Sequence, residues 1–240
     1  DDKKVSTALI QGIIDWAKPF GITGIHGPLG FTDFDFEGTL IEGFDELATQ
    51  ATIYNFPYYA SHFESLGFSK ACDWLEGRGE VPKELPKRMV RGTSLIKTRF
   101  KLEAKKIKSK SQIKTYSKGI FQTLNSSFTN LYGFYTLTDK QIDYYVDAYL
   151  GFVRKEFVTI IVNEKDEVVA CAITLPSISK ALQKARGKLY PFGFIHLLQA
   201  FRKNDTLDML LIGVNPQYQK LGASQLIFVE LLSNFIKKKV

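Results

Sequence analysis

Cysteine is scarce in this sequence. Cys72 and Cys171 are the only two among 240 residues, and no C-x-x-C spacing occurs. A disulfide framework needs several cysteines, and a structural zinc site needs closely spaced cysteine or histidine ligands. The three histidines are also far apart in the sequence. We therefore predict neither a disulfide scaffold nor a metal site.

Long hydrophobic runs are missing too. No apolar stretch approaches the ~20 residues that a membrane-spanning helix requires. The N-terminal segment begins with acidic residues and then spaces Val5, Leu9, Ile13 and Trp16 at helical intervals. This spacing predicts an amphipathic helix that ends near Gly21, not a signal peptide. We expect a cytoplasmic protein with no membrane partner.

Basic residues outnumber acidic ones, and the net charge of +7 favours anionic ligands or partners. Nine cations fall between residues 97 and 118, where Glu103 is the single acid. Such a run indicates a solvated face or a linker. Nucleic-acid binding is the alternative, although no recognised nucleic-acid module surrounds the run. The nine residues are Lys97, Arg99, Lys101, Lys105, Lys106, Lys108, Lys110, Lys114 and Lys118.

Apolar residues make up 45% of the chain, which is enough for a packed core. In the N-terminal part, the pattern predicts strands at 21–31 and 68–77. Between them, the segment 57–68 is expected to form a short helix closed by Gly67. Glycines, prolines and charges then mix at 77–88, which predicts a boundary between two units.

Beyond this boundary the pattern predicts a sheet. Apolar segments at 157–162 and 168–175 are separated by a short charged turn, as in a β-hairpin. The segment 207–214 is apolar on both faces, which we interpret as a central strand. The predicted fold class is therefore mixed α/β (α+β), with a mostly antiparallel central sheet flanked by helices.

Helices are predicted between and after these strands. One covers 111–132, and the next begins at a capping box formed by Thr138 and Gln141. Ser177 is expected to cap a further helix that ends at Gly187. The last helix starts at about Gly222 and is mostly apolar around its circumference, so we expect it to be largely buried.

The stretch GVNPQYQKLGAS, residues 213–224, connects the last predicted strand to the last helix. A helix start exposes unpaired backbone N–H groups, and the helix dipole adds positive potential there. Gly222 would let an anion approach the backbone, since no side chain obstructs it. Two interpretations remain open from this stretch alone: an ordinary turn, or a cradle for a phosphate.

The same stretch resembles the acyl-CoA signature of the GNAT superfamily of N-acyltransferases, V-x-P-x-[YF]-[QR]-x-x-G-x-[GA]. In that family the signature joins the fourth strand to the third helix. One position departs from it, because Ser224 stands where glycine or alanine is usual. The matching residues are Val214, Pro216, Tyr218, Gln219, Gly222 and, with that departure, Ser224.

The resemblance implies a binding site for acyl-CoA, as acetyl-CoA or a longer acyl-CoA, which serves as co-substrate. The main chain of Ile212, Gly213 and Val214 would line the acyl-pantetheine arm. The loop would hold the CoA pyrophosphate, chiefly through its backbone amides. The loop residues are Gln219, Lys220, Leu221, Gly222, Ala223 and Ser224.

A second phrase, SHFESLGF at 61–68, resembles the end of the fourth helix in the same family. There a tyrosine often protonates the departing CoA thiolate, but this chain has Phe63. The two motifs occur in reverse order for one domain. The chain therefore resembles bacterial proteins with tandem GNAT-like domains, and a permuted single domain is the alternative.

On the tandem account, 1–80 is the second half of one domain, and 116–240 is the first half of the next. The basic segment 81–115 would be a linker that includes a strand. The GNAT interpretation requires a central position for 207–214, and a helix or an edge strand there would contradict that interpretation.

The expected chemistry is direct attack of an unidentified amine on the acyl thioester within a ternary complex. Asp208 is the candidate base, acting through a water because its side chain is short, and a strand amide would stabilise the oxyanion. A merely solvated Asp208 is the simpler alternative. The predicted function is an acyl-CoA-dependent N-acyltransferase, with a non-catalytic acyl-CoA-binding module as the alternative and nucleic-acid binding as a third possibility.

Overall fold

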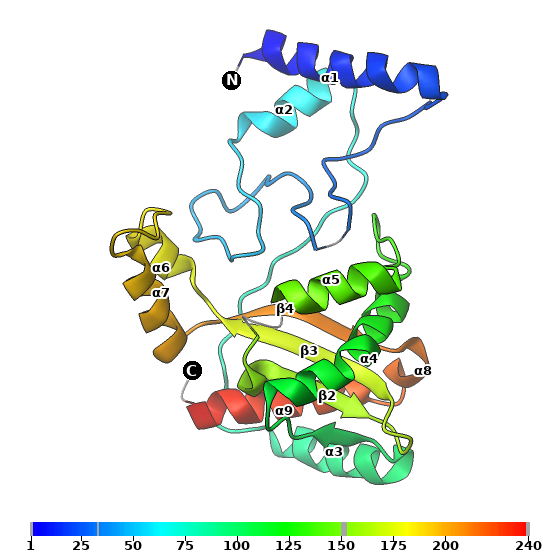
Figure 1. Ribbon diagram of the computed structural model, residues 1–240, viewed down its shortest axis with the longest axis vertical. Helices are drawn as coiled ribbons and strands as arrows, with labels where there is room; N and C mark the ends of the chain where they lie inside the picture. Colours follow the sequence, from blue (N-terminus) through cyan, green and yellow to red (C-terminus); the bar gives the residue numbers. More distant parts are fainter. Residues whose placement is uncertain (1, 33, 150–152, 239–240) are drawn as a thin grey trace. The chain divides into compact units, whose positions relative to one another are not determined.

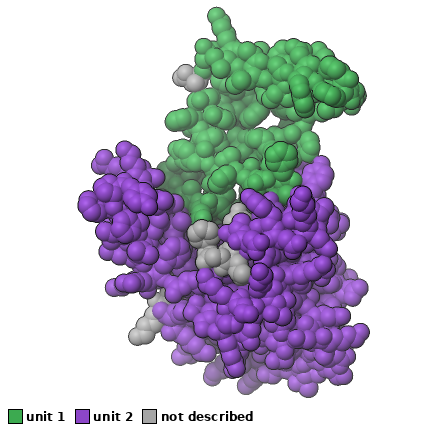
Figure 2. Space-filling view, in the orientation of Figure 1, with its two compact units in different colours: residues 1–77 green, residues 78–240 purple. Residues whose placement is uncertain are grey.

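The computed structural model of the chain describes residues 2–32, 34–149 and 153–238. The chain divides into two compact units, Asp1–Gly77 and Arg78–Val240, which Figure 2 shows in green and purple. The sheet belongs to the second unit.

The first unit consists of helices joined by irregular chain. Its helices are α1 (Lys3–Ala17), the 3-10 turn η1 (Lys18–Phe20) and α2 (Tyr58–Ser65). The predicted amphipathic first helix is confirmed, and Gly21 ends it in a left-handed conformation at φ 71°. Closure of α2 by Gly67 is also confirmed, because the Gly67 amide donates to Glu64 O and the Phe68 amide to Phe63 O.

The strands predicted at 21–31 and 68–77 are wrong, because the described residues of both segments contain none. An extended segment becomes a strand only when a neighbouring segment pairs with it, and neither segment has such a partner in the described chain. Glycines and Pro28 also interrupt 21–31, and they weaken strand formation.

The second unit is built on a four-stranded antiparallel sheet in the order β1-β2-β3-β4 (Figure 1). This arrangement confirms the predicted fold class and the predicted hairpin. The strands are β1 (Glu103–Lys105), β2 (Val158–Val162), β3 (Val168–Pro176) and β4 (Leu207–Val214).

Helices cover both faces of this sheet. On one face α4 lies against β3 and β4, and the Cys171 thiol approaches Ile120 O at 4.0 Å. On the other face α9 packs across β1, β2 and β3, and α3 packs on α9. The helices of the unit are α3 (Lys87–Phe100), α4 (Lys110–Phe128), α5 (Asp139–Tyr149), the 3-10 turn η2 (Lys155–Phe157), α6 (Ser179–Lys184), α7 (Gly193–Arg202), α8 (Pro216–Gln219) and α9 (Ala223–Lys238).

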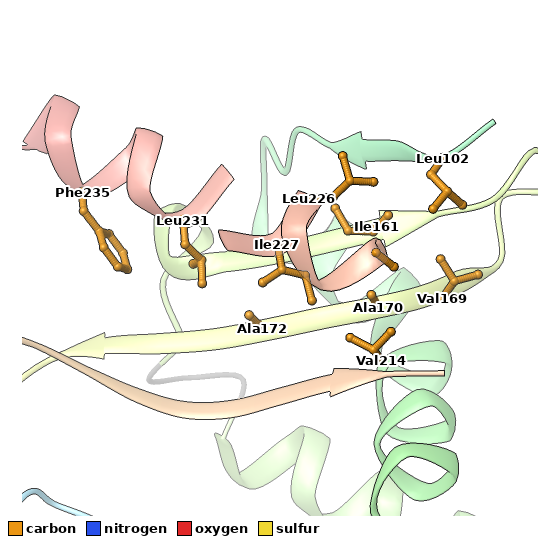
Figure 3. Packing of buried hydrophobic residues seen from close by; sticks show 11 residues of the cluster. Leu102, Ile161, Val169, Ala170, Ala172, Val214, Leu226, Ile227, Leu231 and Phe235 are labelled. Atoms are coloured by element: carbon orange, nitrogen blue, oxygen red, sulfur yellow. The ribbon is translucent and has the colours of Figure 1, made fainter. Parts of the chain in front are cut away.

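The core on the α9 side contains buried side chains from the sheet and from α9 (Figure 3). Ile161 of β2 and Ala170 of β3 meet Leu226 and Ile227 of α9, and all four are completely buried. Figure 3 shows Leu231 and Phe235 extending the same row along the helix. Burial of this apolar surface provides the main stabilisation of the unit.

Two predictions about β4 and its surroundings are wrong. Within the described sheet β4 is the last strand and pairs with β3 alone, so it is not central. One face of β4 packs against α4, and Val214 joins the core beneath α9, whereas Met209 is 55% exposed. An apolar sequence therefore does not show that a strand has a partner on both edges. Ser177 does not cap α6 either, since the N-cap position is Ile178 and lacks a side-chain bond.

The basic segment is more ordered than expected. The strand predicted within it is present as β1, but Lys87–Phe100 forms the helix α3. Five of the nine cations pair with carboxylates, including Lys97 with Glu230 at 2.9 Å and Lys101 with Glu164 at 2.7 Å. Cations that are paired in this way are less available to phosphates, which disfavours the nucleic-acid interpretation.

The two cysteines are predicted to differ in reactivity. Burial raises the pKa of the Cys171 thiol to about 12, so it stays protonated at neutral pH. Cys72 is partly exposed. A disulfide-forming thiol reagent should therefore modify only Cys72 quickly in the native chain and both thiols after denaturation. Rapid modification of both in the native chain would contradict the burial of Cys171.

Candidate functional site

The loop predicted to bind a phosphate contains an additional short helix. After β4, Asn215 accepts a bond from the Gln217 amide and caps α8. The backbone then passes through Gly222 at φ 85° and enters α9. The strand therefore does not run directly into the last helix.

The loop amides are only partly available to a ligand. Those of Lys220 and Leu221 donate to Tyr218 O, and that of Gly222 faces Gln219 O at 3.4 Å. The expectation that all five amides from Lys220 to Ser224 are unpaired is therefore wrong for these three. Among the described residues, no acceptor is found for the amides of Ala223 and Ser224, which start α9.

Gly222 has a structural reason to be glycine. A Cβ atom at this position would lie 2.6 Å from Ile96 Cδ1 of α3, and the φ of 85° is itself unfavourable for other residues. The close approach of α3 to α9 therefore accounts for Gly222 without an anion. The sequence interpretation, in which this glycine admits a phosphate, is not needed to explain it.

An open hollow of about 360 Å³ lies between the starts of α3 and α9. Arg88 at the start of α3 and Ser224 at the start of α9 both line it. The Gln225 side chain donates to Met89 O at 3.0 Å and ties the two helices together. Arg88 could not be linked to the loop from sequence, because it lies more than a hundred residues before the loop in a segment interpreted as a boundary.

The outer edge of β4 presents backbone groups near the loop. The Asn215 amide donates to Val169 O, so Val214 and Ala170 form a non-hydrogen-bonded pair of the β3–β4 ladder. The backbone N–H and C=O groups of Val214 therefore point away from β3. Because this orientation alternates along a strand, the backbone groups of Ile212 point the same way. The Val214 amide donates to Ser127 Oγ and its carbonyl accepts from the Gln219 side chain, both at 3.1 Å.

Of the three predicted lining residues, Ile212 is therefore the one whose edge-facing groups have no partner in the described chain. The backbone of Gly213 faces β3 instead, opposite Cys171. An extended ligand that pairs with this edge would reach Ile212 first.

Asp208 is buried, with 8% of its surface exposed, and lies opposite Leu175 of β3. The alternative of a merely solvated acid is therefore wrong. Between Asp208 and the loop, Leu210 is an extra residue opposite the Ile173/Thr174 step, which forms a β-bulge. The bulge places Asp208 on the α4 side of the sheet, the side that Gly213 also faces.

A second hollow, of about 490 Å³, lies between α4, the β2–β3 turn and Asn215. Its wall carries the carboxylates of Asp166 and Glu167. Hydrogen bonds from Lys105 and then Tyr116 lower the pKa of Asp166, so this carboxylate stays ionised at neutral pH. Negative charge on this side disfavours a phosphate there, whereas Arg88 favours one in the first hollow.

The described part of the chain holds no group of three or more His, Cys, Asp or Glu side chains that could hold a metal ion. The upstream motif at 61–68 lies in the first unit, where Phe63 stacks edge-on against Phe68. Its ring therefore takes part in closing α2.

None of the described helices has the length and apolarity that crossing a bilayer requires.

Two curated proteins are similar to this chain. YghO of Escherichia coli (strain K12) is 26% identical over 250 residues, which cover 100% of this chain and 62% of YghO. A protein named bacterial ceramide synthase, from Caulobacter vibrioides, is 24% identical over 226 residues, which cover 91% of this chain and 57% of that protein. The chain thus spans about three fifths of the length of these relatives. No protein-family model matches the sequence.

Proposed function

We propose that this chain carries the acyl-CoA-binding part of an N-acyltransferase of the GNAT superfamily. The observation that carries the proposal is the position of the signature residues 214–224. They connect the fourth strand of an antiparallel sheet to a long helix whose first two amides lack acceptors in the described chain, and Ser224 lines the same hollow as Arg88. The amides and the guanidinium would hold the CoA pyrophosphate.

The similarity to a bacterial ceramide synthase supports the reaction class. A ceramide contains an amide bond between a fatty acyl group and the amine of a sphingoid base, so making that bond is N-acylation. A long-chain acyl-CoA and a lipid amine are therefore the substrates that we propose to test first.

The edge position of β4 contradicts the central position that the sequence interpretation required. The half-domain predicted at 116–240 lacks the fifth strand, which leaves its fourth strand at an edge. The central position predicted for β4 was therefore inconsistent with that half-domain. The edge position therefore argues against a complete GNAT sheet within this chain. The proposed binding part does not require a further strand, since the Ile212 backbone groups that face the open edge of β4 have no partner in the described chain.

In the proposed mechanism the pantetheine arm extends along the β4 edge and bonds to Ile212. The bulge at Leu210 interrupts the ladder and provides the candidate amide for the oxyanion. Asp208 lies two residues away, about 7 Å along the strand. At that distance a water would relay the proton from the amine to its carboxylate.

The non-catalytic alternative rests on two departures from the family's motifs: Phe63 stands in place of the usual tyrosine in the first unit, and Ser224 in place of glycine or alanine in the loop. Acyl transfer to a sphingoid base, measured by mass spectrometry, distinguishes the two. Product formation that is lost in Asp208→Asn while CoA affinity is kept would favour catalysis. If the wild-type chain binds CoA but forms no product, the binding module would be favoured.

The phosphate site is tested by calorimetric titration of CoA into the chain. Arg88→Glu should weaken CoA by about tenfold or more, because a charge-assisted hydrogen bond is worth about 1.5–3 kcal/mol and the new carboxylate repels phosphate. Arg91→Glu, an exposed arginine on the same helix that does not line the hollow, is the matched control and should change affinity little.

Pantetheine, which lacks the pyrophosphate, provides the complementary control. It should bind more weakly than CoA, and Arg88→Glu should not affect it. If CoA does not bind, or if Arg88→Glu and Arg91→Glu weaken it equally, then Ser224 and Arg88 do not form the phosphate site.

A further inference from the structure

The segment between β3 and β4 forms a helical hairpin, α6 followed by α7, at one end of the sheet (Figure 1). Its base is fixed to the body of the unit. The Ser177 amide donates to Thr206 O at 2.9 Å, and Arg154 Nη1 donates to Phe201 O at 2.7 Å. The hairpin is thus anchored at both of its ends.

Large apolar side chains are exposed on this hairpin. The loop between the helices exposes 83% of Tyr190 and 70% of Phe192. On α7, Phe194 and Leu198 are four residues apart and so share one face. A cluster of large apolar side chains exposed on a protein surface indicates an interaction site. We call it the apolar patch: Leu189, Tyr190, Phe192, Phe194, Ile195 and Leu198.

The surroundings of the apolar patch are strongly basic. The sequence 177–204 contains six cations and no acid. Lys180 pairs with Asp205 at 3.4 Å, but the other five are exposed and have no ion-pair partner in the described chain. These five are Lys184, Arg186, Lys188, Arg202 and Lys203.

We infer that the apolar patch and its five cations dock on an anionic membrane surface. Aromatic and aliphatic side chains flanked by lysine and arginine are the combination that inserts into the interface of a bilayer with acidic headgroups. A second copy of this chain is the less suitable occupant, because a symmetric contact would bring the same cations together.

This inference goes beyond the proposed function and does not depend on it. It concerns a surface contact, so it agrees with the lack of a spanning helix among the described residues. It departs from the sequence-based expectation of no membrane partner, because that expectation considered only spanning segments.

The test is flotation of the 240-residue chain with vesicles of phosphatidylcholine, with and without phosphatidylglycerol. Binding should require phosphatidylglycerol and should weaken as salt is added. Tyr190→Ser combined with Phe192→Ser should lower the partition coefficient by at least about tenfold. Arg186→Glu combined with Lys188→Glu should lower it by about thirtyfold or more.

Matched controls use exposed residues elsewhere in the second unit. Leu131→Ser with Tyr135→Ser removes comparable apolar area, and Lys87→Glu with Lys140→Glu makes the same change in net charge. Both pairs should retain most of the binding. Phe192→Trp should also retain it, and its fluorescence should shift to the blue when vesicles are added.

Three results would overturn the inference. The chain could fail to float with phosphatidylglycerol vesicles, or the hairpin variants could bind as well as the controls. Alternatively, sedimentation without lipid could show a dimer that Tyr190→Ser with Phe192→Ser dissociates. That last result would assign the apolar patch to a second copy of the chain.

Discussion

Gly222→Val is expected to lower the free energy of unfolding by about 2–4 kcal/mol. A β-branched residue is strained at the φ of 85° that Gly222 adopts. Its side chain would also collide with Ile96, whose Cδ1 lies 2.6 Å from the position of a Cβ atom. Urea denaturation followed by circular dichroism measures the loss.

Gly79→Val is the matched control, because no atom lies within 4 Å of a Cβ at that position and its φ is not positive. It should change stability by less than about 0.5 kcal/mol. Equal denaturation midpoints for the two variants would refute the close contact between α3 and α9. The same contact means that a loss of CoA affinity in Gly222→Val would not by itself identify a phosphate site, which is why Arg88→Glu is the sharper test.

Leu226→Ala is expected to cost about 2–5 kcal/mol of unfolding free energy. The Leu226 side chain is completely buried between α9 and the sheet, so its removal leaves a cavity that rigid neighbours cannot fill. Phe228→Ala on the same helix is the control, since that ring is 38% exposed, and it should cost about 1 kcal/mol or less. A smaller loss for Leu226→Ala than for Phe228→Ala would contradict the orientation of α9.

Most elements of the second unit could be predicted from sequence, because their signals are local. The capping box is an example: the Thr138 amide donates to the Gln141 side chain and the Gln141 amide to Thr138 Oγ1, as expected. The hairpin of β2 and β3 and the helix after Gly222 also follow from periodicity and turn residues. These patterns act within one segment and need no knowledge of the rest of the fold.

The errors arose where a distant segment decides the structure. The lysines of α3 suggested a linker, but the helix is held by its packing on α9. The strands predicted at 21–31 and 68–77 had no partner to pair with. Arg88 and Ser224 line one hollow because α3 packs on α9, and no local pattern in either segment indicates it.

The site was therefore predictable only in part. The loop at 213–224 and the candidate base Asp208 could be identified from sequence, whereas the bonding of individual amides could not. Which amides remain unpaired depends on the insertion of α8, and the side of the sheet that Asp208 faces depends on the extra residue Leu210. A single bulge reverses the face of every residue on one side of it.

The pairing of Lys97 with Glu230 joins residues that are 133 positions apart in the chain. A ribosome that adds about 5–20 residues per second needs roughly 7–27 s to make that length. Throughout this interval α3 lacks the helix that covers it, and once β2 and β3 have been made one face of the sheet lacks it too. Their apolar residues then face water or a chaperone. Synthesis that stops before α9 would leave that face uncovered permanently, so such shortened chains should aggregate or be degraded.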